Sequence, residues 1–219
     1  MMIEENPLNA VQPAPDCTLC PRLAAYREEQ RIAQPKWWNA PVPAFGDPEA
    51  WLTIVGLAPG LHGANRTGRA FTGDEAGRLL FATLAKFGFV DGEYGADPMD
   101  AIRLNGVMLL NAVKCVPPHN KPMPEEIRTC RTFLRAEREA LPKARVFLAL
   151  GQIAHQSTVK MLGGKLPKLR FEHGAVHRLP RGEWLIDSYH CSRLNTGTGR
   201  LTAEMFEAVF EQAMALRPC

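Results

Sequence analysis

The stretch WLTIVGLAPGLHGANRTGRAFTGDEAG, residues 51–77, decides how this chain folds. Its apolar, β-branched start at 52–55 is typical of a buried strand, which ends in the segment GLAPG. Pro59 prevents an immediate helix, so an open loop follows until a helical pattern begins at Glu75. Three more glycines lie in that loop: Gly63, Gly68 and Gly73. Parallel α/β sheets build their sites where a strand opens into a loop, and glycine lets the backbone approach a ligand closely, so this stretch predicts a binding site.

The same stretch lacks the common nucleotide-binding fingerprints. No G-x-G-x-x-G motif follows the strand, and the sequence G-x-x-x-x-G-K-[ST] does not occur in the chain. The loop therefore indicates a site of another kind, whose chemistry has to be deduced from its own residues.

Outward from this stretch, apolar runs and helical patterns alternate along the chain. Further strands are predicted at 107–113, 146–150 and 184–189, and helices at about 18–30, from 75, from 124, at about 152–162 and from Thr202 to about 216. Strands that alternate with helices predict one α/β domain over 1–219, with a parallel sheet covered on both faces. The proline-rich residues 1–15 are expected to be a flexible N-terminal segment, and 164–182 to hold an extra hairpin.

Composition narrows the class of protein only a little. The chain has 219 residues, 46% of them hydrophobic, and a net charge of +3, which permits nucleic-acid binding without arguing for it. No apolar stretch approaches the roughly 20 residues of a membrane helix. No basic region followed by an apolar core opens the chain, so we expect a cytoplasmic protein whose cysteines stay reduced.

Six cysteines are present, and four of them have a spacing that suits a metal centre. Cys17 and Cys20 form a C-x-x-C pair, and Cys115 and Cys130 are separated by fourteen residues. Four thiolates hold either a structural zinc ion or an iron–sulfur cluster, and spacing alone does not separate the two. A redox pair at C-x-x-C and a buried, inert Cys115 are the alternatives. Cys191, next to His190, is the cysteine expected to be reactive.

Polar residues gather after the second and fourth strands, and the carboxyl ends of parallel strands meet at one edge of the sheet. Asn111 carries a rigid amide suited to reading a base edge, although an Asn there is also a common turn cap. His190 directly follows the last strand and is expected to point into the same cleft as Gly56. Phe71 either stacks on a planar ring or is a core aromatic.

Basic and exposed residues in these loops indicate contact with nucleic acid. Leu194, between Arg193 and Asn195, fits a wedge inserted into a base stack, with an ordinary loop leucine as the alternative. Further arginines of the glycine-rich loops are expected to hold phosphates: Arg66, Arg69 and Arg200. A merely solvated charged face is the simpler interpretation of such a group.

Together these residues resemble the uracil-DNA glycosylase superfamily, most closely its family 5. The motifs that carry the resemblance are GLAPG at 56–60, GANRTGRAFTGD at 63–74, LLNAVKCVPP at 109–118 and HCSRLNTGTGRLT at 190–202. The resemblance implies a three-layer α/β/α fold with a central four-stranded parallel sheet. It also implies a [4Fe-4S] cluster on Cys17, Cys20, Cys115 and Cys130, and hydrolysis of the N-glycosidic bond of a flipped base in DNA.

The resemblance also implies roles for individual residues. His190 would stabilise the departing base, and Asp74 would orient water or stabilise the sugar cation, unless it is only a helix N-cap. Asn111 is a second candidate for holding the water. The base pocket would comprise Gly56, Leu57, Ala58, Gly60, Phe71, Asn111 and His190.

Several positions depart from patterns of related enzymes. Leu57 and Ala58 are apolar where other families of the superfamily carry an acidic residue, which removes the usual water activator and predicts a permissive pocket that also accepts hypoxanthine. Cys191 replaces a usual proline, and Gly60 a frequent alanine. We expect a monomer acting on double-stranded DNA. The alternatives are a cluster-bearing module that binds damaged DNA without cleaving it, and a small-molecule α/β enzyme.

Overall fold

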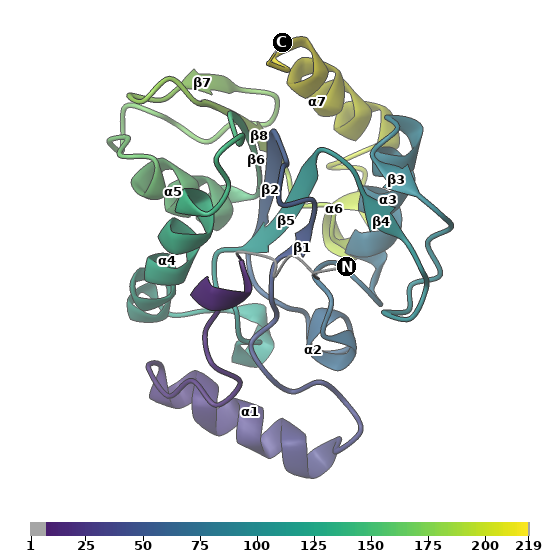
Figure 1. The fold of residues 1–219 in the computed structure, drawn as a ribbon, viewed down its shortest axis with the longest axis vertical. Coiled ribbons are helices and arrows are strands. Elements are labelled where there is room, and N and C mark those ends of the chain that lie inside the picture. The colour runs from purple at the N-terminus through teal and green to yellow at the C-terminus, as the bar shows by residue number, and fades with distance from the viewer. Residues whose placement is uncertain (1–7, 219) are drawn as a thin grey trace, which may run out of the picture.

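The computed structural model describes residues 8–218, which form a sheet between two layers of helices (Figure 1). The six-stranded sheet has the order β1-β5-β2-β6-β8-β7. Its four central strands are parallel: β2 (Leu52–Gly56), β5 (Val107–Asn111), β6 (Val146–Leu150) and β8 (Trp184–Ser188). These are the four predicted strands, which confirms the predicted fold class.

Two short antiparallel strands at the edges were not predicted as part of the sheet. β1 (Phe45–Gly46) pairs with β5, and β7 (Val176–Arg178) pairs with β8. The hairpin expected within 164–182 is therefore formed between β7 and β8 instead. The second sheet consists only of β3 (Val90–Asp91) and β4 (Arg103–Leu104).

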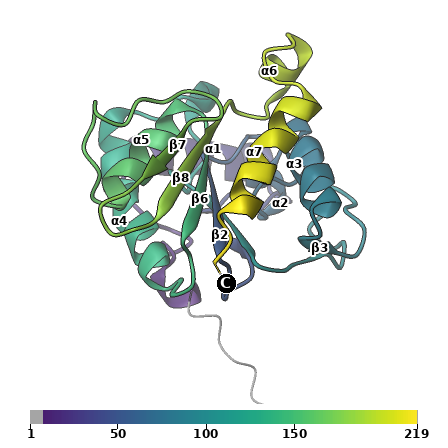
Figure 2. The same ribbon diagram turned by 90° about the horizontal axis from the view of Figure 1, so that it is seen from above.

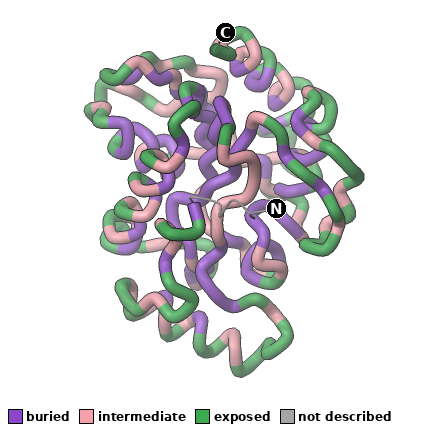
Figure 3. The backbone as a smooth tube through the Cα atoms, in the orientation of Figure 1, coloured by how far each residue is buried: buried purple, intermediate pink, exposed green. Residues whose placement is uncertain are grey.

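Alternate side chains of the central strands pack into two cores, one on each face of the sheet. Figure 3 shows the buried residues gathered along the central strands. Ile54 and Leu148 face α3 (Glu75–Lys86) and α7 (Ala203–Ala215), whereas Val55 and Ala149 face α4 (Pro124–Glu139) and α5 (Gln152–Met161). Figure 2 shows these two helix pairs on opposite sides of the strands. Burial on both faces explains why these strands are almost continuously apolar.

Helix starts follow the capping residues of the sequence. The side chains of Asp74 and Thr202 accept backbone N–H bonds at the starts of α3 and α7, and Pro124 occupies the first turn of α4. α1 (Pro21–Ala33) begins three residues later than predicted. Its first residue is Pro21, and proline favours the first position of a helix. Short helical segments occupy the loops: η1 (Asn9–Val11), α2 (Ala64–Thr67), η2 (Pro118–Asn120) and α6 (Arg193–Gly197).

The N-terminal segment expected over 1–15 is described only in its second half. Residues 1–7 lie outside the described part of the chain, but Leu8 is buried in the second core and Gln12 donates a hydrogen bond to Glu137 on α4 at 2.9 Å. The part of this segment that the structure describes is thus packed onto the domain. No helix within residues 8–218 is long and apolar enough to cross a membrane.

Candidate active site

A cleft opens beyond the carboxyl ends of β2 and β8, where the sequence predicts a site. Its volume is about 610 Å³, within the range of small-molecule sites. Seven predicted residues line it: Leu57, Ala58, Gly60 and Asp74 from the glycine-rich loop, and His190, Arg193 and Leu194 from the loop after β8. The topology thus brings together residues more than 100 positions apart in the sequence.

Asp74 caps a helix with one carboxylate oxygen and also lines the cleft. One carboxylate oxygen, Oδ1, accepts the N–H of Gly77 at 3.1 Å and caps α3. The other oxygen, Oδ2, faces Gly60 and Gly63 so closely that a Cβ atom on these residues would lie 3.0 and 2.4 Å from it. Glycine at both positions therefore lets the carboxylate enter the cleft.

His190 is held next to this carboxylate as a neutral side chain. Burial lowers the pKa of His190 below its ordinary value, and the negative charge of Asp74 opposes that shift without reversing it. The backbone carbonyl of His190 accepts a hydrogen bond from the amide of Asn195 at 2.8 Å, which fixes the loop. A neutral imidazole carries one N–H donor, so His190 can donate a hydrogen bond to a polar group in the cleft.

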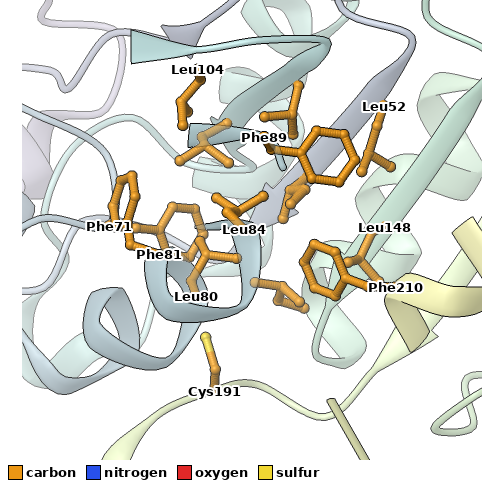
Figure 4. Close-up of a cluster of buried hydrophobic side chains, with 14 of the residues drawn as sticks. Leu52, Phe71, Leu80, Phe81, Leu84, Phe89, Leu104, Leu148, Cys191 and Phe210 are labelled. Atoms are coloured by element: carbon orange, nitrogen blue, oxygen red, sulfur yellow. The ribbon is translucent and has the colours of Figure 1, made fainter. Parts of the chain in front are cut away.

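Gly56, Phe71 and Asn111 form a second group, which adjoins the cleft through Leu57. A Cβ atom on Gly56 would lie 2.5 Å from Cζ of Phe71 and 2.6 Å from Oδ1 of Asn111. Phe71 is buried and belongs to the core shown in Figure 4. The Asn111 side chain makes no hydrogen bond within residues 8–218, so it is not a turn cap. Phe71 and Asn111 do not line the open cleft itself.

The mouth of the cleft carries an exposed apolar side chain on a projecting helix. Leu194 is 75% exposed on α6, which Figure 2 shows standing apart from the main body. Arg193, at the first position of α6, lines the cleft with it. Arg66 and Arg200 are also exposed, and the Arg200 guanidinium lies 4.4 Å from the ring centre of Tyr189.

One predicted DNA contact is wrong, and a second has part of its side chain engaged within the protein. Arg69 is buried, its Nη2 lies 2.8 Å from Oδ2 of Asp100, and its guanidinium packs over Phe45, so it does not reach a surface. The Asn195 amide is engaged by the His190 carbonyl. Arg69 therefore stabilises its loop instead of facing a ligand, and the DNA contact of Asn195 stays a prediction.

The expected reactivity of Cys191 is also wrong. Its thiol is fully buried, and burial, with a smaller effect of the Asp74 charge, raises its pKa to about 12. The sulfur points toward Leu80 in Figure 4 and donates a hydrogen bond to the Ala76 carbonyl at 3.4 Å. Since the thiolate is the reactive form, this cysteine is inert.

The other four predicted cysteines line one apolar pocket between α1, the loop after β5 and α4. They are Cys17, Cys20, Cys115 and Cys130, and none of them forms a disulfide. Burial raises the pKa of Cys115 to about 11 and that of Cys130 to about 12. Thiols clustered in so apolar a place ionise only with a compensating positive charge, which a metal centre supplies.

Hydrogen-bond donors point at two of these sulfurs. The backbone N–H of Lys114 donates to Sγ of Cys130 at 3.2 Å, and the guanidinium of Arg27 donates to Sγ of Cys115 at 3.6 Å. N–H groups directed at cysteine sulfur are among the features that tune iron–sulfur centres. The residues present therefore fit such a group.

A separate buried group consists of His155, His177 and Asp187. Nδ1 of His155 lies 2.8 Å from one Asp187 oxygen, and Nε2 of His177 lies 3.0 Å from the other. Nε2 of His155 also meets the Leu169 carbonyl at 3.0 Å. These contacts make His155 a satisfied core histidine.

Asn120 lines the cleft but was given no role from the sequence. It is the last residue of η2, in the loop after β5, and its backbone is left-handed, with φ of 57°, as is that of His119. Asn tolerates this conformation better than most residues, so an Asn beside the prolines of this loop was a usable signal for a tight turn. The position of Asn120 in the cleft depends on the fold, and no sequence pattern indicates it.

Comparison with known proteins identifies the family of the chain. Residues 43–213 match the family model of the uracil DNA glycosylase superfamily. The chain is 47% identical over 211 residues to the type-5 uracil-DNA glycosylase of Thermus thermophilus, covering 94% of this chain and 96% of that protein. Proteins of the same name from Mycobacterium bovis and Pyrobaculum aerophilum are 41% and 40% identical, covering 91% and 93% of this chain and 78% and 90% of theirs. The chain is therefore a member of the uracil DNA glycosylase superfamily.

Proposed function

We propose that this protein is a monofunctional DNA glycosylase that hydrolyses the N-glycosidic bond of uracil in DNA and leaves an abasic site. The observation that carries the proposal is the cleft in which Asp74 and His190 meet below the exposed Leu194. The similarity to type-5 uracil-DNA glycosylases over more than 90% of this chain supports it.

Access to the base requires that the nucleotide leave the duplex. A base inside the stack is out of reach, and extruding it costs a few kcal/mol, least at a mismatch such as U·G. Leu194, with Arg193 beside it, would fill the vacated space, since both stand at the cleft mouth. Arg66 and Arg200 would hold flanking phosphates.

Cleavage then separates charge inside the cleft. The bond electrons leave with the base, which becomes an anion, and the sugar carbon becomes cationic until a water oxygen adds to it and a proton is released. His190, neutral and N–H donating, would stabilise the anion, and one such preorganised donor contributes about 3–4 kcal/mol. The free Oδ2 of Asp74 would stabilise the cation and orient the water. Asn111 is the second candidate for holding that water.

The apolar first motif suggests a broad substrate range. Leu57 and Ala58 line the cleft without a charged or hydrogen-bonding side chain. This part of the pocket does not reject a base that differs in its polar edge, because the first motif leaves no buried polar partner unpaired. We therefore propose that hypoxanthine is released as well as uracil.

We further propose that Cys17, Cys20, Cys115 and Cys130 hold a [4Fe-4S] cluster. The apolar pocket and the N–H donors at Cys115 and Cys130 support this proposal. The cluster would hold α1, α4 and the loop after β5 together. Such a centre is capable of electron transfer, but hydrolysis of a glycosidic bond requires no electron transfer. Iron and acid-labile sulfide, each four per chain by analogy with cubane clusters, would support it; one zinc ion per chain would contradict it.

The function is tested with duplexes that carry U·G, U·A or hypoxanthine·T. After incubation with the cluster-loaded protein, alkali cleaves the strand wherever a base has been released. We expect release of uracil, strongest at U·G, and a loss on replacing His190 by Ala. Tight binding without cleavage of any duplex would favour the alternative of a damaged-DNA-binding module. Light scattering would test the proposed monomer, and fractionation of cells the proposed cytoplasmic location.

A further inference from the structure

An exposed tryptophan stands in a hollow outside the cleft. Trp38 is 48% exposed, and the hollow around it is lined by Lys36, Trp37, Arg66 and Asp97. Large exposed aromatic side chains are costly in water, and this one serves neither core. An exposed aromatic side chain in a hollow with charged walls is typical of a binding surface.

Trp38 is held in place from several directions. Its indole N–H donates to the Pro41 carbonyl at 3.1 Å, and its backbone N–H donates to the Arg66 carbonyl at 3.1 Å. One part of the ring packs on Gly68, where a Cβ atom would lie 2.7 Å from Cδ2 of the indole. Gly68 is also left-handed, with φ of 77°, so both space and conformation require glycine there. The exposed ring is therefore a fixed platform.

Two cations flank the platform. Neither Lys36 nor Arg66 forms an ion pair with any carboxylate in the described chain, and Nε of Arg66 donates to the His62 carbonyl at 2.8 Å. The carboxylate of Asp97 also lines the hollow, but its Oδ1 accepts the Met99 N–H at 2.8 Å. A rigid aromatic face beside unpaired cations is the combination that binds single-stranded nucleic acid.

The hollow adjoins the cleft through one short helix. Arg66 belongs to α2, in the loop that also supplies Gly60 and Asp74 to the cleft. The Asn65 N–H donates to the Gly60 carbonyl at 3.1 Å, and the Asn39 N–H donates to the Asn65 carbonyl at 3.1 Å. A strand whose lesion lies in the cleft can thus continue across α2 to Trp38.

We propose that Trp38 stacks on an unpaired nucleobase of the DNA strand next to the extruded one, with Arg66 and Lys36 at its phosphate. Bases within a duplex are stacked on both faces and present only their edges, so this platform serves single-stranded or locally opened DNA. The proposal rests on the proposed function and adds a preference that the cleft alone does not create.

The test measures binding to a strand with a tetrahydrofuran abasic analogue, which a glycosylase cannot process. Replacing Trp38 by Leu is expected to weaken binding of the single strand about tenfold and binding of the matched duplex less than twofold, whereas Trp38→Phe keeps most of the affinity. The single strand should quench tryptophan fluorescence in the wild type, and much less in Trp38→Leu. Trp184→Phe is the matched control, because Trp184 begins β8 at the end away from His190 and stacks on Arg178.

Each result is decisive when circular dichroism shows a folded variant. Equal affinity of wild type and Trp38→Leu for the single strand, or an equal loss on single strand and duplex, would overturn the stacking site. Uracil release by the wild type is measured separately. Its absence would remove the glycosylase, while a Trp38-dependent binding of single strands would remain; release without any Trp38 effect would remove only the stacking site.

Discussion

Asp74 depends on two glycines for its position. The free oxygen Oδ2 would lie 2.4 Å from a Cβ atom at position 63 and 3.0 Å from one at position 60. Gly63→Ala therefore has to displace the carboxylate, while Gly60→Ala requires a shift of only a few tenths of an ångström. Because misplacing a catalytic group by about 1 Å costs on the order of 100-fold in rate, we expect kcat for U·G to fall about 100-fold in Gly63→Ala and much less in Gly60→Ala.

A control for the added methyl group is Gly197→Ala, since no atom lies within 4 Å of that Cβ position and the backbone there is helical. All three variants are compared by thermal unfolding, so that a loss of fold is distinguished from a loss of catalysis. A folded Gly63→Ala protein with wild-type kcat would show that Asp74 acts only as the cap of α3.

The lowered pKa of His190 predicts that the activity declines only at unusually low pH. Burial lowers its pKa, so the ring stays neutral in the folded protein at pH values where an ordinary histidine, with a pKa near about 6.5, becomes charged. We expect kcat/KM to be constant from pH 8 down to about 6.5 and to fall only at lower pH, when His190 takes up a proton. The unfolded chain binds that proton more readily, so stability should also decrease as the pH falls through about 6.5.

The comparison is with His190→Ala, in which one preorganised donor is lost. Its kcat should be about 100- to 1000-fold lower, and its acidic limb should disappear. A wild-type profile that already declines above pH 7, or an unchanged acidic limb in the variant, would show that another group controls the rate.

Residues next to the ends of strands were predictable, and residues whose partners are distant were not. Asp74 and His190 follow signals that lie within a few positions of them, the glycine-rich loop and the last strand. Arg69 looked equally available, but its partner Asp100 is 31 positions away on a connection without a recognisable pattern. Only the fold reveals that this arginine is buried.

At the scale of elements, length decided what could be predicted. The four parallel strands have five residues each and are buried on both faces, so their apolar runs are distinct in the sequence. β1 has two residues and β7 three, too few for a periodicity. These edges are defined by pairing with β5 and β8, which is a tertiary property.

A buried ion pair joins two elements of the cysteine region. The ammonium of Lys114, in the loop after β5, lies 2.6 Å from both carboxylate oxygens of Glu137 on α4, and both side chains are almost completely buried. Lys114→Met leaves Glu137 charged and unpaired, and breaking such a pair costs about 3–5 kcal/mol. We expect a loss of that size in the free energy of unfolding, measured in urea.

The double variant Lys114→Met with Glu137→Met separates the pair from its surroundings. Replacing both partners by apolar side chains removes the unpaired charge, so much of the stability should return. Lys143→Met is the surface control, because Lys143 and Glu49 are both largely exposed, and no measurable change is expected. If Lys114→Met alone were as stable as the wild type, water would have to reach the charge of Glu137.

At the scale of the molecule, the sheet fixes one edge at which separate loops meet. The glycine-rich loop supplies the carboxylate, the loop after β8 supplies the imidazole and the exposed leucine, and the loop after β5 supplies Asn120. The apolar cysteine pocket lies against that third loop, through Cys115, and so connects α1 to the same edge. The proposed cluster would stabilise the site from outside the sheet.

The exposed arginines around this edge should determine how binding depends on salt. Each phosphate contact that releases counterions contributes about 0.9 to the slope of log affinity against log salt concentration for duplex DNA. Arg193→Gln should therefore reduce that slope by about 1 on a duplex with a tetrahydrofuran site, because Arg193 is exposed at the cleft mouth. Arg69→Gln should leave the slope unchanged and lower the melting temperature, because it leaves Asp100 without its buried partner. A reduced slope in a stable Arg69→Gln protein would mean that this arginine leaves Asp100 to contact DNA, and that the loop opens on binding.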